Sequence, residues 1–61
     1  MYFYIYKDAK NEFRWRLSGG NGKILADSGE GYHNKADCRH AIDLIRQDAP
    51  TCMIVDITEK T

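Results

Sequence analysis

The sequence has little of what marks a membrane, secreted or nucleic-acid-binding protein. It contains no apolar run near the roughly 20 residues that cross a bilayer, and its first residues lack the basic segment and cleavage site of a signal peptide. Nine basic residues are balanced by nine acidic ones, so no overall positive field attracts nucleic acid or an anionic membrane. We therefore expect a cytoplasmic protein, with neither a membrane nor nucleic acid as its partner.

Cysteine and proline are also scarce. Cys38 and Cys52 could form one disulfide, but in a reducing compartment we expect free thiols. A single proline, 43% hydrophobic residues and 11% aromatic residues distinguish the chain from disordered proteins. With 61 residues the chain forms one domain, spanning 1–61. A core this small usually needs a disulfide, a metal, a partner subunit or unusually good packing.

Three segments predict the strands of an antiparallel meander. Residues 2–7 are aromatic and branched, residues 13–17 alternate apolar side chains with arginines, and residues 23–28 follow a glycine-rich reversal at 18–22. The alternation of a strand places on one face Phe3, Ile5, Phe13, Trp15 and Leu17. The opposite face carries Tyr2, Tyr4, Tyr6, Arg14 and Arg16.

One helix and a final strand are predicted to follow the meander. Residues 35–48 carry an apolar stripe at the spacing of an amphipathic helix, formed by Cys38, Ala41, Ile42 and Ile45. Asn34 is a suitable N-cap, and Pro50 ends the helix because the residue before a proline avoids the α region. Residues 51–58 are apolar on both faces in their first half, as in a strand buried on both sides. The expected fold is α+β, in the order β-β-β-α-β, with the helix packed on one face of the sheet.

One helix covers only one face of a sheet, so the tyrosine face and the last strand lack cover within a single copy. Open strand edges pair readily with another chain, and a symmetric dimer adds buried area to a thin core. We therefore expect a homodimer whose candidate dimer strand contains Cys52, Met53, Ile54, Val55 and Ile57. The alternative is a monomer whose tyrosine face remains in water.

Five segments have a familiar pattern: FYIYKD at 3–8, FRWRL at 13–17, NGKILA at 21–26, GYHNK at 31–35 and CRHAIDLI at 38–45. Together they resemble the YegP-like family of small bacterial proteins of unknown function. Members of that family often carry two such units in tandem, whereas this chain has one. The resemblance implies units used in pairs, which build one continuous sheet and exchange their C-terminal strands. It implies no activity and no catalytic residue.

A candidate binding face is formed by Tyr4, Arg14 and Arg16. Aromatic and basic groups on a sheet can hold an anion or stack on bases. We favour a simpler interpretation, in which the arginine stems lie over tyrosine rings and pair with Asp27 or Glu12. Binding of nucleic acid or an anion on this face remains the alternative function.

Catalytic and metal sites are not indicated. A zinc or thiol site would draw on His33, Cys38, His40 and Cys52, but the spacing is poor, because residues two apart on a helix face away from each other. No base is placed to activate a cysteine. The glycines at 19–22 lack the Lys-Ser/Thr ending of a phosphate loop. We expect a non-enzymatic homodimeric interaction or structural module with no cofactor.

Overall fold

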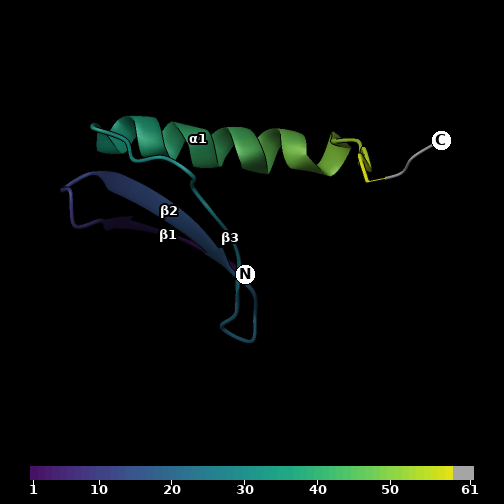
Figure 1. Cartoon of the computed structure of the whole chain (residues 1–61), viewed down its shortest axis with the longest axis horizontal. Coiled ribbons are helices and arrows are strands. Elements are labelled where there is room, and N and C mark those ends of the chain that lie inside the picture. The colour runs from purple at the N-terminus through teal and green to yellow at the C-terminus, as the bar shows by residue number, and fades with distance from the viewer. Residues whose placement is uncertain (59–61) are drawn as a thin grey trace.

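Alternating side chains and two short turns shape the sheet. The computed structural model describes residues 1–58 and contains a three-stranded antiparallel sheet crossed by one helix (Figure 1). The elements are β1 (Tyr2–Lys7), β2 (Phe13–Ser18), β3 (Ile24–Asp27), α1 (Lys35–Asp48) and a single 3₁₀ turn, η1 (Ala49–Thr51). The three strands, the meander and the helix confirm the predicted α+β fold up to the end of the helix.

The strand order is β1-β2-β3, with both pairs antiparallel. The β1–β2 turn contains Asn11 at φ 66°, a left-handed conformation that asparagine tolerates. The β2–β3 turn closes through Gly22, at φ 83°, whose N–H donates to the carbonyl of Gly19 at 3.0 Å. This turn confirms the predicted glycine-rich reversal.

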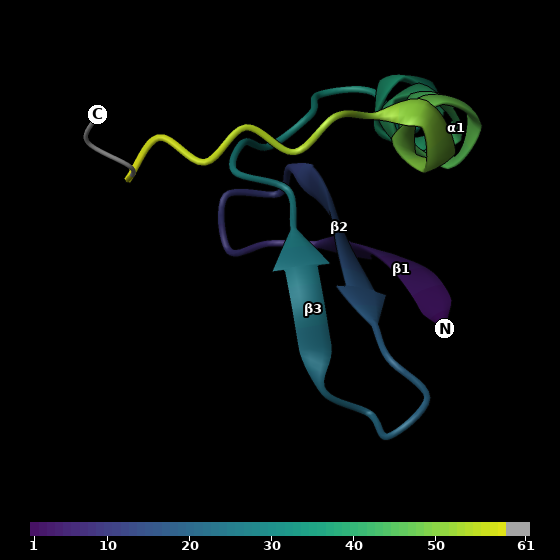
Figure 2. The same ribbon diagram turned by 90° about the vertical axis from the view of Figure 1, so that its right-hand side faces the viewer.

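The core lies between the sheet and the helix. Among residues 1–58 the buried hydrophobic side chains are Trp15, Cys38 and Ile42, and around them pack Phe3, Ile5, Phe13, Leu17, Tyr32 and Ile45. The rings of Phe3 and Trp15 meet edge to face at 5.5 Å. The helix contacts β1 and β2, while β3 lies away from it (Figure 2). The predicted inner face of the sheet is therefore confirmed.

Pro50 ends the helix by a different mechanism from the one predicted. Ala49, which precedes it, is in the right-handed α region at φ −56°, ψ −38°, and its N–H donates to the carbonyl of Ile45. The next rung, to the carbonyl of Arg46, is missing because proline has no N–H. The chain therefore tightens into η1 and leaves the helix without reversing its direction.

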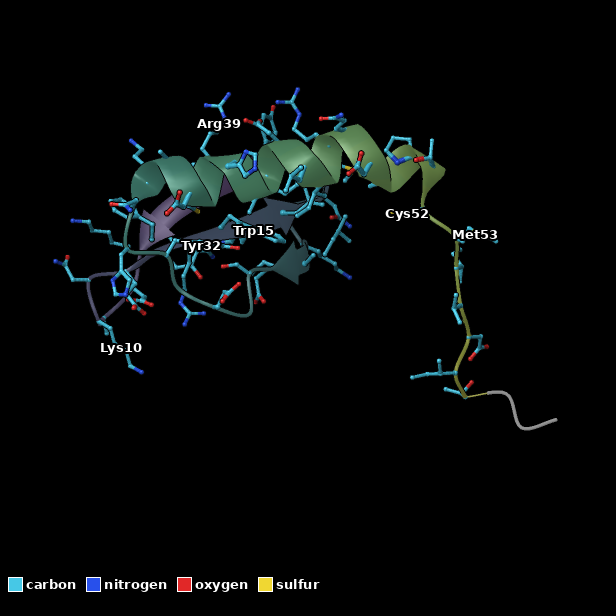
Figure 3. The ribbon with its side chains drawn as sticks, turned by 90° about the horizontal axis from the view of Figure 1, so that it is seen from above. Lys10, Trp15, Tyr32, Arg39, Cys52 and Met53 are labelled. Atoms are coloured by element: carbon cyan, nitrogen blue, oxygen red, sulfur yellow. The ribbon has the colours of Figure 1, made fainter. Side chains whose placement is uncertain are left out.

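The predicted strand over 51–58 is not formed within the single chain. After η1 the backbone is extended at Cys52 (φ −66°, ψ 143°) and pairs with no strand of the described residues. Met53 lies on chain that runs away from the rest of the fold (Figure 3). A strand needs a neighbour to accept and donate its backbone hydrogen bonds, and a single copy supplies none here.

Candidate functional site

The tyrosine–arginine face lies on the side of the sheet opposite the helix. Cross-strand pairing places Tyr4 opposite Arg16 and Tyr6 opposite Arg14. The Arg16 guanidinium stacks over the Tyr6 ring at 4.6 Å from its centroid, which confirms the expected packing of arginine over tyrosine. Tyr2 and Tyr4 are 65% and 50% exposed, with ring centroids 6.0 Å apart. The structure thus brings Tyr4 and Arg16 together on an open aromatic surface.

Arg14 shares this face but is held by other groups. Its Nε donates to Oδ2 of Asp8 at 2.6 Å, and its terminal nitrogen donates to the carbonyl of Ser28 at 3.3 Å. The hydrogen bond from Arg14 holds the pKa of Asp8 below its ordinary value, and the same contact raises the pKa of Arg14. The expected partners, Asp27 and Glu12, are therefore corrected to Asp8. The side chain of Arg14 therefore links the first turn and the end of β3 through these contacts.

Ser28 is a structural residue behind this face that the sequence did not reveal. Its hydroxyl accepts the backbone N–H of Trp15 at 3.1 Å, and its own N–H donates to the carbonyl of Trp15 at 2.9 Å. This buried serine extends the β2–β3 ladder past the end of β3 and also holds Arg14. No local pattern marks it, because its partners are 13 and 14 residues away.

The two thiols occupy unlike environments. Cys38 is fully buried under the sheet, and burial raises the pKa of its thiol, which disfavours the nucleophilic thiolate. Cys52 is exposed beyond the helix, and both cysteines are free. The imidazole of His33 is exposed, with Nδ1 3.9 Å from a carboxylate oxygen of Glu12. Within residues 1–58, no group of three or more His, Cys, Asp or Glu side chains is placed to hold a metal ion.

Exposed apolar side chains gather on the last part of the described chain. Residues 52–57, here termed the C-terminal segment, carry four large side chains that are 77–98% exposed: Met53, Ile54, Val55 and Ile57. No helix within residues 1–58 is long and apolar enough to cross a membrane. With its exposed apolar side chains and its backbone in no strand, the C-terminal segment combines hydrophobic surface with unpaired backbone groups. A β-sheet edge recognises this combination.

A groove runs beside β1, under the edge of the helix. It consists of two hollows of about 360 and 490 Å³ that share Met1, Phe3 and Arg46. Further lining comes from Ile5, Leu17, Ile42 and Ile45. The groove thus places apolar side chains and arginines beside an open strand edge.

The single chain is more extended than its mass predicts. Its accessible surface is 5291 Å², against about 4,000 Å² for a folded monomer of 7.0 kDa. The radius of gyration is 13.8 Å, against roughly 10.5 Å for a compact domain of this length. The indole N–H of Trp15 is also buried with no acceptor among residues 1–58. A single copy therefore leaves surface uncovered and a core donor unpaired.

Residues 8–56 match the model of a domain of unknown function, DUF1508. The chain belongs to this family. A DUF1508-type relative, a UPF0339 protein of Neisseria meningitidis serogroup B, is 47% identical over 57 residues, which cover 93% of this chain and all of the relative. DUF1508 and UPF0339 denote the YegP-like family, so the resemblance seen in the sequence is confirmed.

Two further relatives of the DUF1508 family bear on its architecture. The solution structure of a protein from Haloferax volcanii superposes with a TM-score of 0.83 at 40% identity, covering 90% of this chain and 92% of that one. A UPF0339 protein of Stutzerimonas stutzeri is 40% identical over 48 residues, which are 79% of this chain but 42% of that protein. The unit therefore occurs both alone and within a longer chain.

Proposed function

We propose that the protein is a non-enzymatic, homodimeric interaction module in which the C-terminal segment of each copy completes the fold of the other. The observation that carries this proposal is the segment itself, whose four apolar side chains are at least 77% exposed on an unpaired backbone. Burying one such side chain contributes roughly 1.5–3 kcal/mol. A segment of this kind favours association with a second copy over solvation.

The surface that a single copy leaves uncovered is large enough for a stable interface. The excess over a compact monomer is about 1,300 Å² per copy by the size scaling of folded proteins. Stable protein interfaces bury about 800 Å² per partner. The Stutzerimonas relative, with more than half of its length outside the match, has room for a second unit in one chain. An assembly of two units is compatible both with one longer chain that carries two units and with two copies of a chain that carries one.

A binding role also agrees with the chemistry of the described side chains. Cysteine thiolates are strong nucleophiles, but Cys38 lies in the core, where burial raises the pKa of its thiol. Arg14, a cation of the sheet face, forms an ion pair with Asp8 at 2.6 Å. These contacts stabilise the fold and leave no activated group among them.

The assembly is tested by size-exclusion chromatography with light scattering at micromolar concentration. We expect twice the 7.0 kDa subunit mass for the native chain. Ile54→Lys places a charge in the segment and is expected to weaken the dimer by at least about tenfold, equal to about 1.4 kcal/mol. Leu44→Lys, which makes the same change at an exposed aliphatic position of α1, is the matched control and should remain dimeric. A native chain that elutes as a monomer would contradict the proposal.

A second candidate function is the binding of single-stranded nucleic acid on the tyrosine–arginine face. The exposed rings of Tyr2 and Tyr4 beside the guanidinium of Arg16 favour it, because stacking on aromatic rings accepts any base. The test is oligonucleotide binding at low salt with Arg16→Ala and Tyr4→Ala, against Arg39→Ala on the helix as control. Binding that falls with added salt and with the two sheet variants supports this function. Equal binding by all three variants would exclude it.

A further inference from the structure

The outer edge of β1 carries backbone groups that pair with no strand of residues 1–58. Trp15 of β2 lies opposite Ile5 in the register of β1 and β2. Both backbone groups of Trp15 nevertheless bond to Ser28, on the β3 side, at 3.1 and 2.9 Å. Because opposed residues of an antiparallel ladder alternate between bonded and non-bonded pairs, the N–H and C=O groups of Ile5, and those of Phe3 two residues earlier, face outward.

The β1 edge also lacks the features by which proteins keep strand edges from pairing. Such features are short strands, charged residues and bulges. The β3 edge has all three, since β3 spans four residues between Lys23 and Asp27, and its pairing with β2 is irregular between Leu17 and Ser18. The β1 edge has six residues, with no charge from Tyr2 to Tyr6. An added strand is therefore favoured at β1 over β3.

Apolar side chains line a groove along this edge, under the helix. The helix contacts β1 and β2 but not β3 within the described chain. Phe3, Ile5 and Ile42 line one hollow of the groove, and Ile45 lines the other. Side chains along a strand alternate between its two faces. Every second side chain of a strand added to β1 would therefore enter the groove and lose its contact with water.

The rim of the groove is net positive. Arg39 and Arg46 line it from α1, and Asp43, at 3.4 and 4.0 Å from them, supplies one carboxylate against the two guanidinium groups. Seven residues of helix separate the two arginines by about 10 Å along the axis. Four residues of a strand span about 13 Å and return to the same face. Acidic side chains four residues apart in an added strand would therefore reach both arginines.

The groove lies away from the surface on which the proposed dimer depends. Figure 2 shows the chain beyond α1 running to the side of the sheet on which β3 lies, away from β1. Within the described residues, no member of the C-terminal segment lines either hollow. The β1 edge is thus open to a different partner, whether one copy or two make up the protein.

We infer that the outer edge of β1 and the adjoining groove bind an extended peptide of another protein, with apolar residues at its centre and acidic residues at its flanks. This inference rests on the proposed role as an interaction module, but not on the dimer. The outward N–H and C=O groups of Phe3 and Ile5 favour a peptide over an amphipathic acid, because an apolar chain leaves such groups unpaired. In the complex β1 becomes an internal strand.

Amide hydrogen exchange, followed by NMR in the isotope-labelled native chain, tests this site directly. The probes are two synthetic peptides with blocked ends, Glu-Val-Ile-Val-Glu and Lys-Val-Ile-Val-Lys, which differ only in the charge of their flanks. We expect the acidic peptide at saturation to slow exchange of the Phe3 and Ile5 N–H groups by at least about tenfold. The N–H of Tyr4, which bonds to β2, should change little and serves as the internal reference.

The charge preference is tested on the same probes. We expect the acidic peptide to bind at least about fivefold more tightly than the basic one, since several weak charge pairs reverse sign together. The difference should shrink with added salt. Changing Arg39 and Arg46 together to glutamine should remove the preference. Lys35→Gln, at the start of α1 and outside the lining of both hollows, is the matched control and should retain it.

Four results would overturn the β1 site. Slow exchange of Phe3 and Ile5 before any peptide is added would mean that this edge is already paired in the protein. Slowed exchange at Leu25 and Asp27 would place the peptide on β3 instead. Shifts of the groove side chains without slowed exchange would assign the groove to an amphipathic acid, and no response to either peptide at millimolar concentration would leave it without a partner. The dimer is judged separately, by light scattering.

Discussion

At the scale of single residues, Asp8 organises the first turn and the outer face of the sheet together. Its Oδ1 accepts the backbone N–H groups of Lys10 and Glu12 at 2.9 and 3.0 Å, while its Oδ2 accepts from Arg14 at 2.6 Å. One carboxylate thus ties a turn to a neighbouring strand. Its charge is needed only for the contact with Arg14, since an amide oxygen can accept the two backbone bonds.

Asp8→Asn isolates that charge, and we expect it to lower the melting temperature at about pH 6, where the carboxylate is ionised. The pKa of Asp8 is held below 3.8 by Arg14, so its stabilising effect is fully present above that value and is lost as the pH falls through the folded pKa. The melting temperatures of the native chain and the Asp8→Asn variant should therefore converge toward about pH 2. Asp27→Asn, at a carboxylate with no side-chain hydrogen bond or ion pair in the described chain, is the control. Equal pH dependence in all three chains would contradict the role of Asp8.

The sequence predicted that tyrosines and arginines share this face, but it did not predict which carboxylate pairs with Arg14. Strict alternation is enough to place Arg14 and Arg16 beside tyrosines, because it depends only on the period of a strand. The choice of Asp8 over Asp27 and Glu12 depends on where the β1–β2 turn closes. Asp8 lies two residues beyond Tyr6, the residue opposite Arg14, and so comes diagonally within reach. That geometry is set by the turn and not by local composition.

At the scale of elements, the β2–β3 hairpin offers two glycines in unlike conformations. Gly22 has φ 83°, whereas Gly20 has no left-handed φ, and an added Cβ at either would meet open space. We expect Gly22→Ala to lose about 1–2 kcal/mol from left-handed strain. Gly20→Ala should be neutral or should stabilise the fold by up to about 1 kcal/mol, because alanine lowers the conformational entropy of the unfolded chain. Thermal melts of both variants at one protein concentration measure the difference. Equal melting temperatures would show that the turn relaxes.

Elements defined by local periodicity were predicted closely, and the one that depends on a distant partner was not formed. The helix bounds agree with the 3.6-residue stripe, and the first three strands agree with alternation and turn residues. Residues 52–57 have the composition of a buried strand, yet they make no ladder in the single chain. Composition reports that a segment is suited to burial, but it does not report where the burying surface lies.

At the scale of the whole molecule, stability should depend on protein concentration. If each copy completes the other, unfolding is coupled to dissociation, and mass action favours the folded dimer by about 1.4 kcal/mol per tenfold rise in concentration. With an unfolding entropy of about 2.1 cal/mol/K per residue, the two 61-residue subunits that unfold together give a rise of about 5 °C per tenfold. Calorimetry or circular dichroism over a hundredfold range would then show a shift of about 10 °C. Ile54→Lys should melt lower than the native chain at every concentration, while Leu44→Lys should behave as the native chain. A native melting temperature that stays constant over the range would mean that one copy folds alone, with its exposed segment contributing nothing to stability.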